Sequence, residues 1–216
     1  MTFVDLVAQL KHHLADLAVL GLSILAGWAA TWIIRKETGK PAIYAFPVIG
    51  ASLVVAAWTV AVMPQNGMAI VTFLLGWALM MLATVDAVCF RLPDAITLPL
   101  TAFGLVASFW MPNPQPLNHL IGAAAGFFAF YCIAILYSRV RGREGLGLGD
   151  AKLVASAGAW LGWIALPYVV LIGCAGAFAW IGIAVLRRGR QALHEQIPFG
   201  VPLCFAFWIV WLYGPP

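Results

Sequence analysis

The chain has 216 residues, of which 63% are hydrophobic and only 9% are charged, and its mean hydropathy is +0.96. Soluble domains carry about 25% charged residues, so this composition excludes a soluble globular protein and indicates an all-α integral membrane protein. The net charge of +4 does not indicate nucleic-acid binding, because the basic residues are scattered among short loops instead of gathered on one surface.

Apolar runs separated by proline, glycine or charged residues predict a bundle of about eight transmembrane helices in a single domain, residues 1–216. A span needs roughly 20 apolar residues, with a range of about 17–25, and the sixth and eighth runs are shorter. The first run is too long for the core of a signal peptide, so it predicts a retained span. The runs are residues 14–34, 43–63, 67–86, 95–111, 119–140, 151–165, 167–187 and 199–213.

The distribution of lysine and arginine predicts the orientation of these spans. The loops after the first, third, fifth and seventh runs hold eleven of the twelve basic residues, whereas the opposite side holds only Lys11. Loops rich in lysine and arginine remain in the cytoplasm. The pattern therefore predicts a multi-pass protein with both termini outside.

Four acidic residues lie on the predicted cytoplasmic side, beside the ends of spans: Asp86, Asp94, Glu144 and Asp150. Ionisable residues at membrane depth are costly and usually functional. Two carboxylates held close together share one proton, so one can activate a water while the other protonates a carbonyl or a leaving amine. This chemistry needs no metal.

Structural and ion-pathway roles are the alternatives for these aspartates. Asp150 is a candidate helix N-cap, and Asp86 is placed to pair with Arg91 in the following loop. The residues alone leave these alternatives open beside a catalytic pair.

The segment "GREGLGLGDAKL", residues 142–153, is the densest polar cluster of the chain. Its glycines at 145, 147 and 149 predict a loop that adopts backbone angles closed to other residues and lets another backbone approach closely. We expect a substrate strand to lie across Asp150 there.

Two segments resemble the motifs of the type IV prepilin peptidases, a bacterial family of GxGD-type membrane aspartic proteases. "DAVCFRLPDAITLPL", residues 86–100, is similar to the first family motif, and "REGLGLGDAKL", residues 143–153, is similar to the second. The stretch "AGAWLGW" continues the likeness, which covers residues 67–187 well. These residues are expected to form the catalytic core.

The resemblance implies an endopeptidase that removes the short basic leader from prepilins or pseudopilins at the cytoplasmic face of the bacterial inner membrane. Asp86 and Asp150 match the two catalytic aspartates. Asp94 and Lys152 match recurrent family positions and are assigned support roles. Asp94 is expected to cap the fourth span, and Lys152 either tunes Asp150 or extends to the interface. Glu144 is expected to offset the repulsion between the basic leader and the basic loops.

The N-terminal part departs from the family pattern. Many members carry a zinc-binding loop with paired C-x-x-C motifs between the first two spans, and they methylate the new N-terminus with S-adenosylmethionine. The corresponding loop here, residues 35–42, is short and has no cysteine. The four cysteines of the chain are far apart, which predicts buried apolar residues and no metal site. Proteolysis is expected to need no cofactor.

Two other functions compete with a leader peptidase. One is a bifunctional peptidase and N-methyltransferase, which the short loop disfavours. The other is a non-enzymatic transporter or assembly protein that uses the aspartates to carry protons. Such a protein would not need the glycine loop and would not cleave a prepilin.

Overall fold

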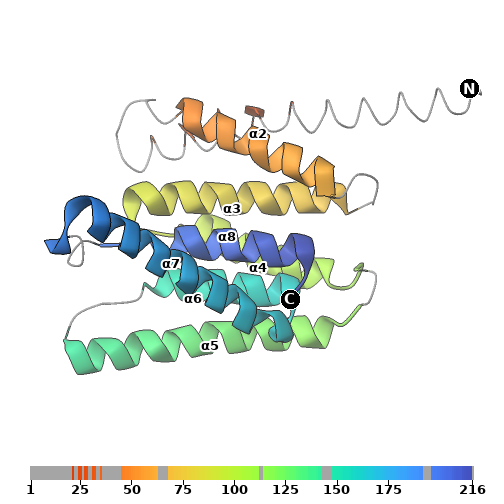
Figure 1. Cartoon of the computed structure of the whole chain (residues 1–216). Helices are drawn as coiled ribbons and strands as arrows, with labels where there is room; N and C mark the ends of the chain where they lie inside the picture. The colour runs from red at the N-terminus through yellow and green to blue at the C-terminus, as the bar shows by residue number, and fades with distance from the viewer. Residues whose placement is uncertain are drawn as a thin grey trace, which may run out of the picture. The chain divides into compact units, whose positions relative to one another are not determined.

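The computed structural model describes residues 21, 24–25, 27–28, 31–32, 35, 45–62, 68–111, 114–142, 147–191 and 196–215. Within these residues no strand is present, which confirms the all-α prediction for this part of the chain. The first predicted span, residues 14–34, and the loop at 35–42 lie largely outside the described residues. The helices are α2 (Ala45–Val62), α3 (Ala69–Cys89), α4 (Asp94–Ala107), α5 (Pro116–Arg141), α6 (Leu148–Leu161), the 3₁₀ helix η2 (Trp163–Ala165), α7 (Leu166–Arg188) and α8 (Gly200–Tyr213) (Figure 1).

The helices fall into two length classes. Among the described residues, three segments are long and apolar enough to cross a membrane: Ile70–Cys89, Pro116–Arg141 and Trp163–Arg188. Helices α4, α6 and α8 have 14 residues each, which corresponds to about 21 Å at 1.5 Å per residue, against a hydrocarbon core of about 30 Å. The prediction of about eight spans is therefore not confirmed.

The chain divides into two compact units, residues 1–81 and 82–216, with the division inside α3. In the first unit, α2 carries apolar or small residues at almost every position, a composition typical of a helix that needs no polar face. The second unit contains the last two turns of α3 and helices α4–α8, and it holds both aspartates of the predicted pair. The single domain expected from the sequence stays a prediction.

Helices α5 and α6 of the second unit pack with their backbones in direct contact. A Cβ atom on Gly158 of α6 would overlap the backbone of Gly122 of α5, and one on Gly126 would lie 2.9 Å from the carbonyl oxygen of Val154. His119 Nδ1 donates to the Ala159 carbonyl oxygen at 3.0 Å. Small residues at such positions let two helices approach closely, as in G-x-x-x-G motifs of membrane proteins.

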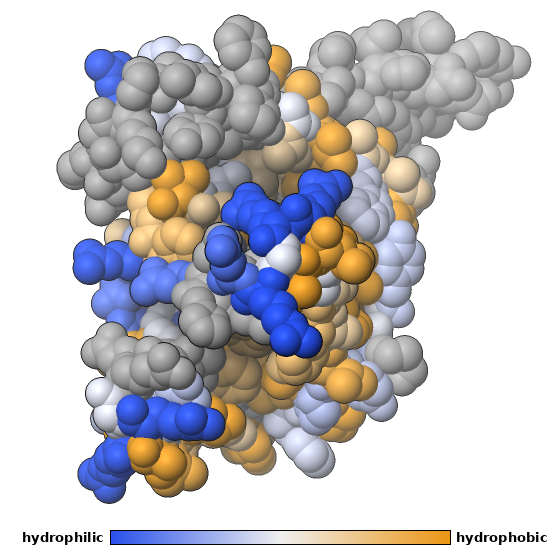
Figure 2. Space-filling view, turned by 60° about the vertical axis from the view of Figure 1, so that its left-hand side comes forward, coloured by the Kyte–Doolittle hydropathy of each residue, from blue (hydrophilic) through white to orange (hydrophobic). Residues whose placement is uncertain are grey.

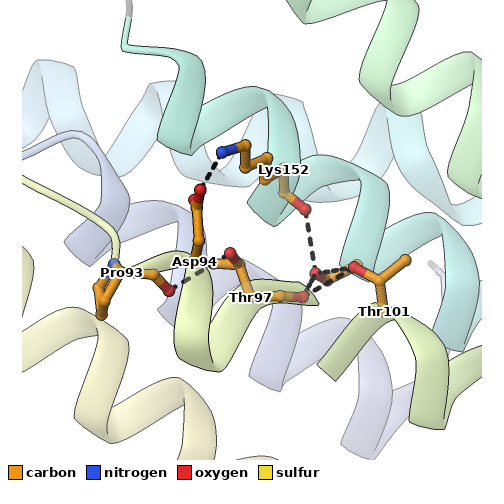
Figure 3. A network of polar contacts seen from close by, with 6 residues as sticks. Pro93, Asp94, Thr97, Thr101 and Lys152 are labelled. Carbon is orange, nitrogen blue, oxygen red and sulfur yellow. Dashed lines mark hydrogen bonds and ion pairs between the residues drawn. The ribbon is translucent and has the colours of Figure 1, made fainter. Parts of the chain in front are cut away.

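Helices α4 and α6 run parallel and are joined by buried hydroxyl groups (Figure 3). The Ser156 hydroxyl lies 2.7 Å from the Thr101 hydroxyl and 3.2 Å from the Thr97 carbonyl oxygen. Further along, Trp160 Nε1 donates to the Leu100 carbonyl oxygen at 2.8 Å. Because buried polar groups need partners, these bonds fix the register between α4 and α6.

Helices α5 and α7 extend past their neighbours at one end of the second unit. Gly126 of α5 contacts Val154 of α6. Fifteen residues of α5 follow Gly126, whereas only six residues of α6 precede Val154. The difference of nine residues corresponds to about 14 Å. Pro202 of α8 likewise contacts Gly176 of α7. Counted from this contact, the C-terminus of α7 extends about 15 Å beyond the first residue of α8. The N-termini of α6 and α8 are therefore set back from the ends of α5 and α7 (Figure 1).

The end of the second unit where α6 and α8 begin is its polar end. Hydrophilic side chains gather there in the space-filling view that brings this side forward (Figure 2). The C-termini of α3, α5 and α7 and the N-termini of α4, α6 and α8 meet at this end. Its described basic residues are Arg91, Arg139, Arg141, Lys152, Arg187, Arg188 and Arg190.

Candidate active site

Asp86 lies in the last turn of α3 and is only 5% exposed. Helix α3 ends three residues later, where Phe90 adopts a left-handed backbone conformation with φ of 54°. This conformation is uncommon for a bulky residue, and it turns the chain sharply. Leu92, two residues further on, is consequently buried beside the first turns of α6 and α8.

Asp150 is the third residue of α6 and is 9% exposed. Gly147 occupies the N-cap position in an extended conformation, so the interpretation of Asp150 as the N-cap is wrong. The Asp150 carboxylate instead accepts a hydrogen bond from the backbone N–H of Gly147. A side chain at the third helical position that reaches back in this way is the second half of a capping box. The local helix start therefore orients the carboxylate.

The two carboxylates form an interacting pair. Asp150 directly precedes the apolar run 151–165. Burial raises the pKa of Asp150 to about 7, and the nearby negative charge of Asp86 is the second cause of this increase. Like charges in a poorly solvated place favour one shared proton. Within the described residues Asp86 has no ion pair with Arg91, so the alternative of a loop salt bridge is wrong. The structure brings together the two aspartates that the sequence singled out.

The first turn of α8 supplies a third wall of the site, which sequence reasoning missed. A Cβ on Gly200 would lie 2.7 Å from Asp86 Oδ2 and 3.2 Å from Leu92 Cδ1. One turn further along α8, Cys204 is fully buried within electrostatic reach of both carboxylates. The sequence signal was a lone glycine in "IPFGVPL", which marks a helix start but carries no ionisable group.

Asp94 and Lys152 form an ion pair at the open end of the α4–α6 seam, with Nζ and Oδ1 2.5 Å apart (Figure 3). The N-cap of α4 is Pro93, and Asp94 makes no capping hydrogen bond, so the expected cap at Asp94 is wrong. Its carboxylate reaches across to α6 because Lys152 lies opposite. Lys152 follows Asp150 by two residues, so the pair ties the first turn of α6 to α4.

The glycines of the second motif differ in their surroundings. Gly147 has φ of −75°, and a Cβ there would meet nothing closer than Asp150 Oδ2 at 3.7 Å. A Cβ on Gly149 would lie 2.9 Å from the Cβ of Leu92. Neither residue has a positive φ, so the expected need for special backbone angles is wrong for both. Close approach remains the reason for glycine at 149. Gly145 and Glu144 lie outside the described residues.

Among the described residues, no group of three or more His, Cys, Asp or Glu side chains is close enough to hold a metal ion. A groove of about 490 Å³ between α5, α6 and α7 is lined by apolar groups, including Ala129, Val154 and Val170. Among its lining residues, only Trp163 and Cys174 carry a polar side-chain atom.

The sequence is similar to known proteins over most of its second unit. The family model described as "Type IV leader peptidase family" matches residues 73–185. The prepilin leader peptidase/N-methyltransferase of Burkholderia pseudomallei (strain K96243) is 40% identical over 172 residues, which cover 79% of this chain and 55% of that protein. The proteins of the same name from Aeromonas hydrophila and Pseudomonas putida are 41% and 37% identical over 65% and 68% of this chain, and over 48% and 50% of their own lengths.

These comparisons confirm the resemblance drawn from the two motifs. The chain spans about half the length of the curated relatives it matches. No solved structure matches it.

Replacement of Asp150 by asparagine should stabilise the protein at neutral and alkaline pH. The raised pKa of about 7 means that the unfolded chain loses the Asp150 proton first, near its ordinary value of 3.8. The free energy of unfolding of the parent protein therefore decreases as the pH rises from about 4 to about 7, and it stays low above that range. The variant should melt a few degrees above the parent at pH 8, since about 1 kcal/mol shifts Tm by roughly 2–4 °C in a chain of this size.

The measurement is tryptophan fluorescence during heating in detergent, at pH 4 and at pH 8. The two proteins should melt together at pH 4. Asp94→Asn is the matched control, and it should not stabilise at either pH because it breaks the ion pair with Lys152. An equal Tm for the parent and Asp150→Asn at pH 8 would contradict the raised pKa of the buried Asp150.

Proposed function

Because the chain belongs to the type IV leader peptidase family, we propose that it is a membrane aspartic endopeptidase that removes the basic leader from prepilins or pseudopilins. The observation that carries the proposal is the burial of Asp86 and Asp150 as an interacting pair where four helix ends meet. Sequence family and site geometry support the same two residues independently.

In the proposed mechanism, one aspartate is ionised and the other holds the shared proton. The ionised carboxylate takes a proton from a water as the water oxygen attacks the scissile carbonyl carbon, and the protonated carboxyl gives its proton to the carbonyl oxygen. The resulting tetrahedral diol then collapses: the C–N bond breaks, the leaving amine takes the proton that came from water, and one diol hydroxyl returns its proton to the second aspartate as the new carboxyl group forms. The pair returns to its starting state, and no metal enters the reaction.

We propose that the site faces the cytoplasm from the bacterial inner membrane, with both termini outside. The support is the concentration of arginine and lysine in the loops at the polar end of the second unit, since such loops stay in the cytoplasm. The basic leader of a prepilin joins the apolar helix of the prepilin at the cytoplasmic border of the membrane. The substrate is thus a membrane-inserted prepilin, and anionic lipid adds about 1 kcal/mol of attraction per basic leader residue.

Five further residues are proposed to support the pair. The Asp94–Lys152 ion pair holds the first turn of α6 against α4, and close packing of Gly149 on Leu92 sets the depth of Asp150. Gly147 supplies the amide that orients Asp150. Glu144 is proposed, from the sequence alone, to attract the basic leader.

Methyl transfer from S-adenosylmethionine is the second candidate, because the names of the relatives include N-methyltransferase. The groove between α5, α6 and α7 is almost entirely apolar, which does not suit the charged groups of that cofactor. We therefore assign no methyl-transfer step to the described residues. Mass spectrometry of the cleaved pilin N-terminus separates a free amine from a methylated one.

Single substitutions Asp86→Asn and Asp150→Asn should each reduce cleavage at least about 100-fold, because an amide can neither ionise nor return a proton, and general acid–base steps contribute about 10²–10⁴-fold. The assay reconstitutes purified enzyme and a full-length prepilin in vesicles, with cleavage scored by N-terminal sequencing. Asp16→Asn, which changes an acid outside both motifs, is the control and should remain active. Parental activity in either dyad variant would remove that residue from the mechanism.

Alanine at 149 should impair cleavage, whereas alanine at 147 should not. The new methyl group at 149 must displace Leu92, at 2.9 Å, while at 147 it meets only an ordinary contact with Asp150 Oδ2, at 3.7 Å, and the φ of −75° is allowed. We expect Gly149→Ala to lose about tenfold in kcat, the scale on which small misplacements of catalytic groups act. Equal activity of the two variants would show that the loop is only a connector.

The Asp94–Lys152 pair is tested by exchanging its charges. Asp94→Lys and Lys152→Asp alone should each lower kcat several-fold with little change in Tm, because a half-exposed ion pair contributes only about 0–1 kcal/mol to folding. The double exchange restores opposite charges and should recover most of the activity. Additive losses in the double variant would exclude a role for the pair in positioning Asp150.

A further inference from the structure

The backbone of α8 approaches the Asp86 carboxylate more closely than any side chain there would permit. Gly200 is the first residue of α8 and is buried. The Cβ position of Gly200 lies 2.7 Å from Asp86 Oδ2 and 2.9 Å from its Cγ, whereas real Cβ atoms essentially never come within 3.0 Å of another heavy atom. Gly200 has an ordinary φ, so the need for glycine is one of space.

The same turn presents hydrogen-bond donors to Asp86. The backbone N–H groups of Gly200 and Val201 face the Asp86 carboxylate. Pro202 follows and has no N–H, and the Leu203 N–H is taken by the Phe199 carbonyl oxygen at 3.3 Å. The unsatisfied donors at a helix N-terminus carry partial positive charge. The Val201 N–H also lies 3.3 Å from the Pro198 carbonyl oxygen, so this turn directs the Gly200 N–H and a shared Val201 N–H at Asp86.

Helix α7 fixes the position of this turn. The Cβ position of Gly176 lies 3.0 Å from Pro202 Cβ, and that of Gly173 lies 3.1 Å from Leu203 Cδ1. Helix α8 is thus held from the side opposite to α3. Asp86 Oδ2, the oxygen nearest to Gly200, is buried and has no hydrogen-bond partner among the described residues.

We propose that Gly200 is a positioning residue of the site: its missing side chain lets the first turn of α8 pack directly on the Asp86 carboxylate and hold it from the backbone. The turn thereby favours Asp86 as the ionised member of the pair. The titratable groups that face Asp86 within the described residues are Asp150 from α6 and Cys204 from α8. This inference rests on the proposed peptidase function, and its test includes a readout that does not require activity.

The first experiment is a thermal double-mutant cycle between positions 200 and 86. Gly200→Ala should lower the Tm of the parent by several degrees, because the new methyl group collides with the carboxylate. In an Asp86→Ala background the same substitution should cost much less, since the colliding oxygen is gone. Gly176→Ala is the matched control: it crowds α8 through Pro202 and should cost the same in both backgrounds. A Gly200→Ala cost that is independent of residue 86 would overturn the proposed contact.

The second experiment measures the pH–rate profile of Gly200→Ala in the vesicle assay. Loss of the amide contacts should move the acidic limb of the dyad profile to higher pH and reduce kcat at least tenfold, with KM little changed. Gly182→Ala, which has open space around it, should keep the parental profile. An unshifted profile in an active Gly200→Ala enzyme would refute the positioning role alone, whereas an inactive parent would refute the peptidase function itself.

Discussion

The second unit is organised around two carboxylates that are removed from water side by side. An ionised carboxylate away from water is costly unless hydrogen bonds or opposite charges compensate, and a second one nearby adds repulsion. Asp86 and Asp150 are nevertheless buried, because each receives backbone N–H groups from the start of a helix, α8 for Asp86 and α6 for Asp150. Helix starts are suited to this purpose, since their first N–H groups have no partner within the helix.

Such a pair persists only where the surrounding helices cannot relax away from it. Backbone contact at Gly122 and Gly158 leaves no room for α6 to slide along α5. A shift of α6 by one residue would also turn Ser156 away from Thr97 and Thr101 and leave a buried hydroxyl without a partner. Packing and polar contacts therefore enforce the same register, and that register places Asp150 beside Asp86.

The amino-acid pattern predicted the helical class and the approximate position of each described helix, and it singled out the two aspartates that lie buried as an interacting pair. Those successes rest on local signals: long apolar runs, and ionisable residues where the runs end. The short α6 and α8 agree with the short sixth and eighth runs. The C-terminal ends of α4 and α6 were missed, because hydropathy continues past Ala107 and across Gly162 while the helices stop. Asp94 looked like a cap because its partner, Lys152, is 58 residues away. Gly200 was missed for a related reason: its importance lies in a contact with a residue 114 positions earlier.

The short outer helix α4 has a consequence for the lipid around the protein. Leu98, Phe103 and Val106 are each more than half exposed along its 14 residues, so about 21 Å of apolar surface meets acyl chains that prefer about 30 Å. A short hydrophobic surface is accommodated by local thinning of the bilayer, at a fraction of a kcal/mol per Å of mismatch. The thinned annulus would draw phosphate headgroups and water toward the level of the dyad, and it would make turnover depend on acyl-chain length as well as on headgroup charge.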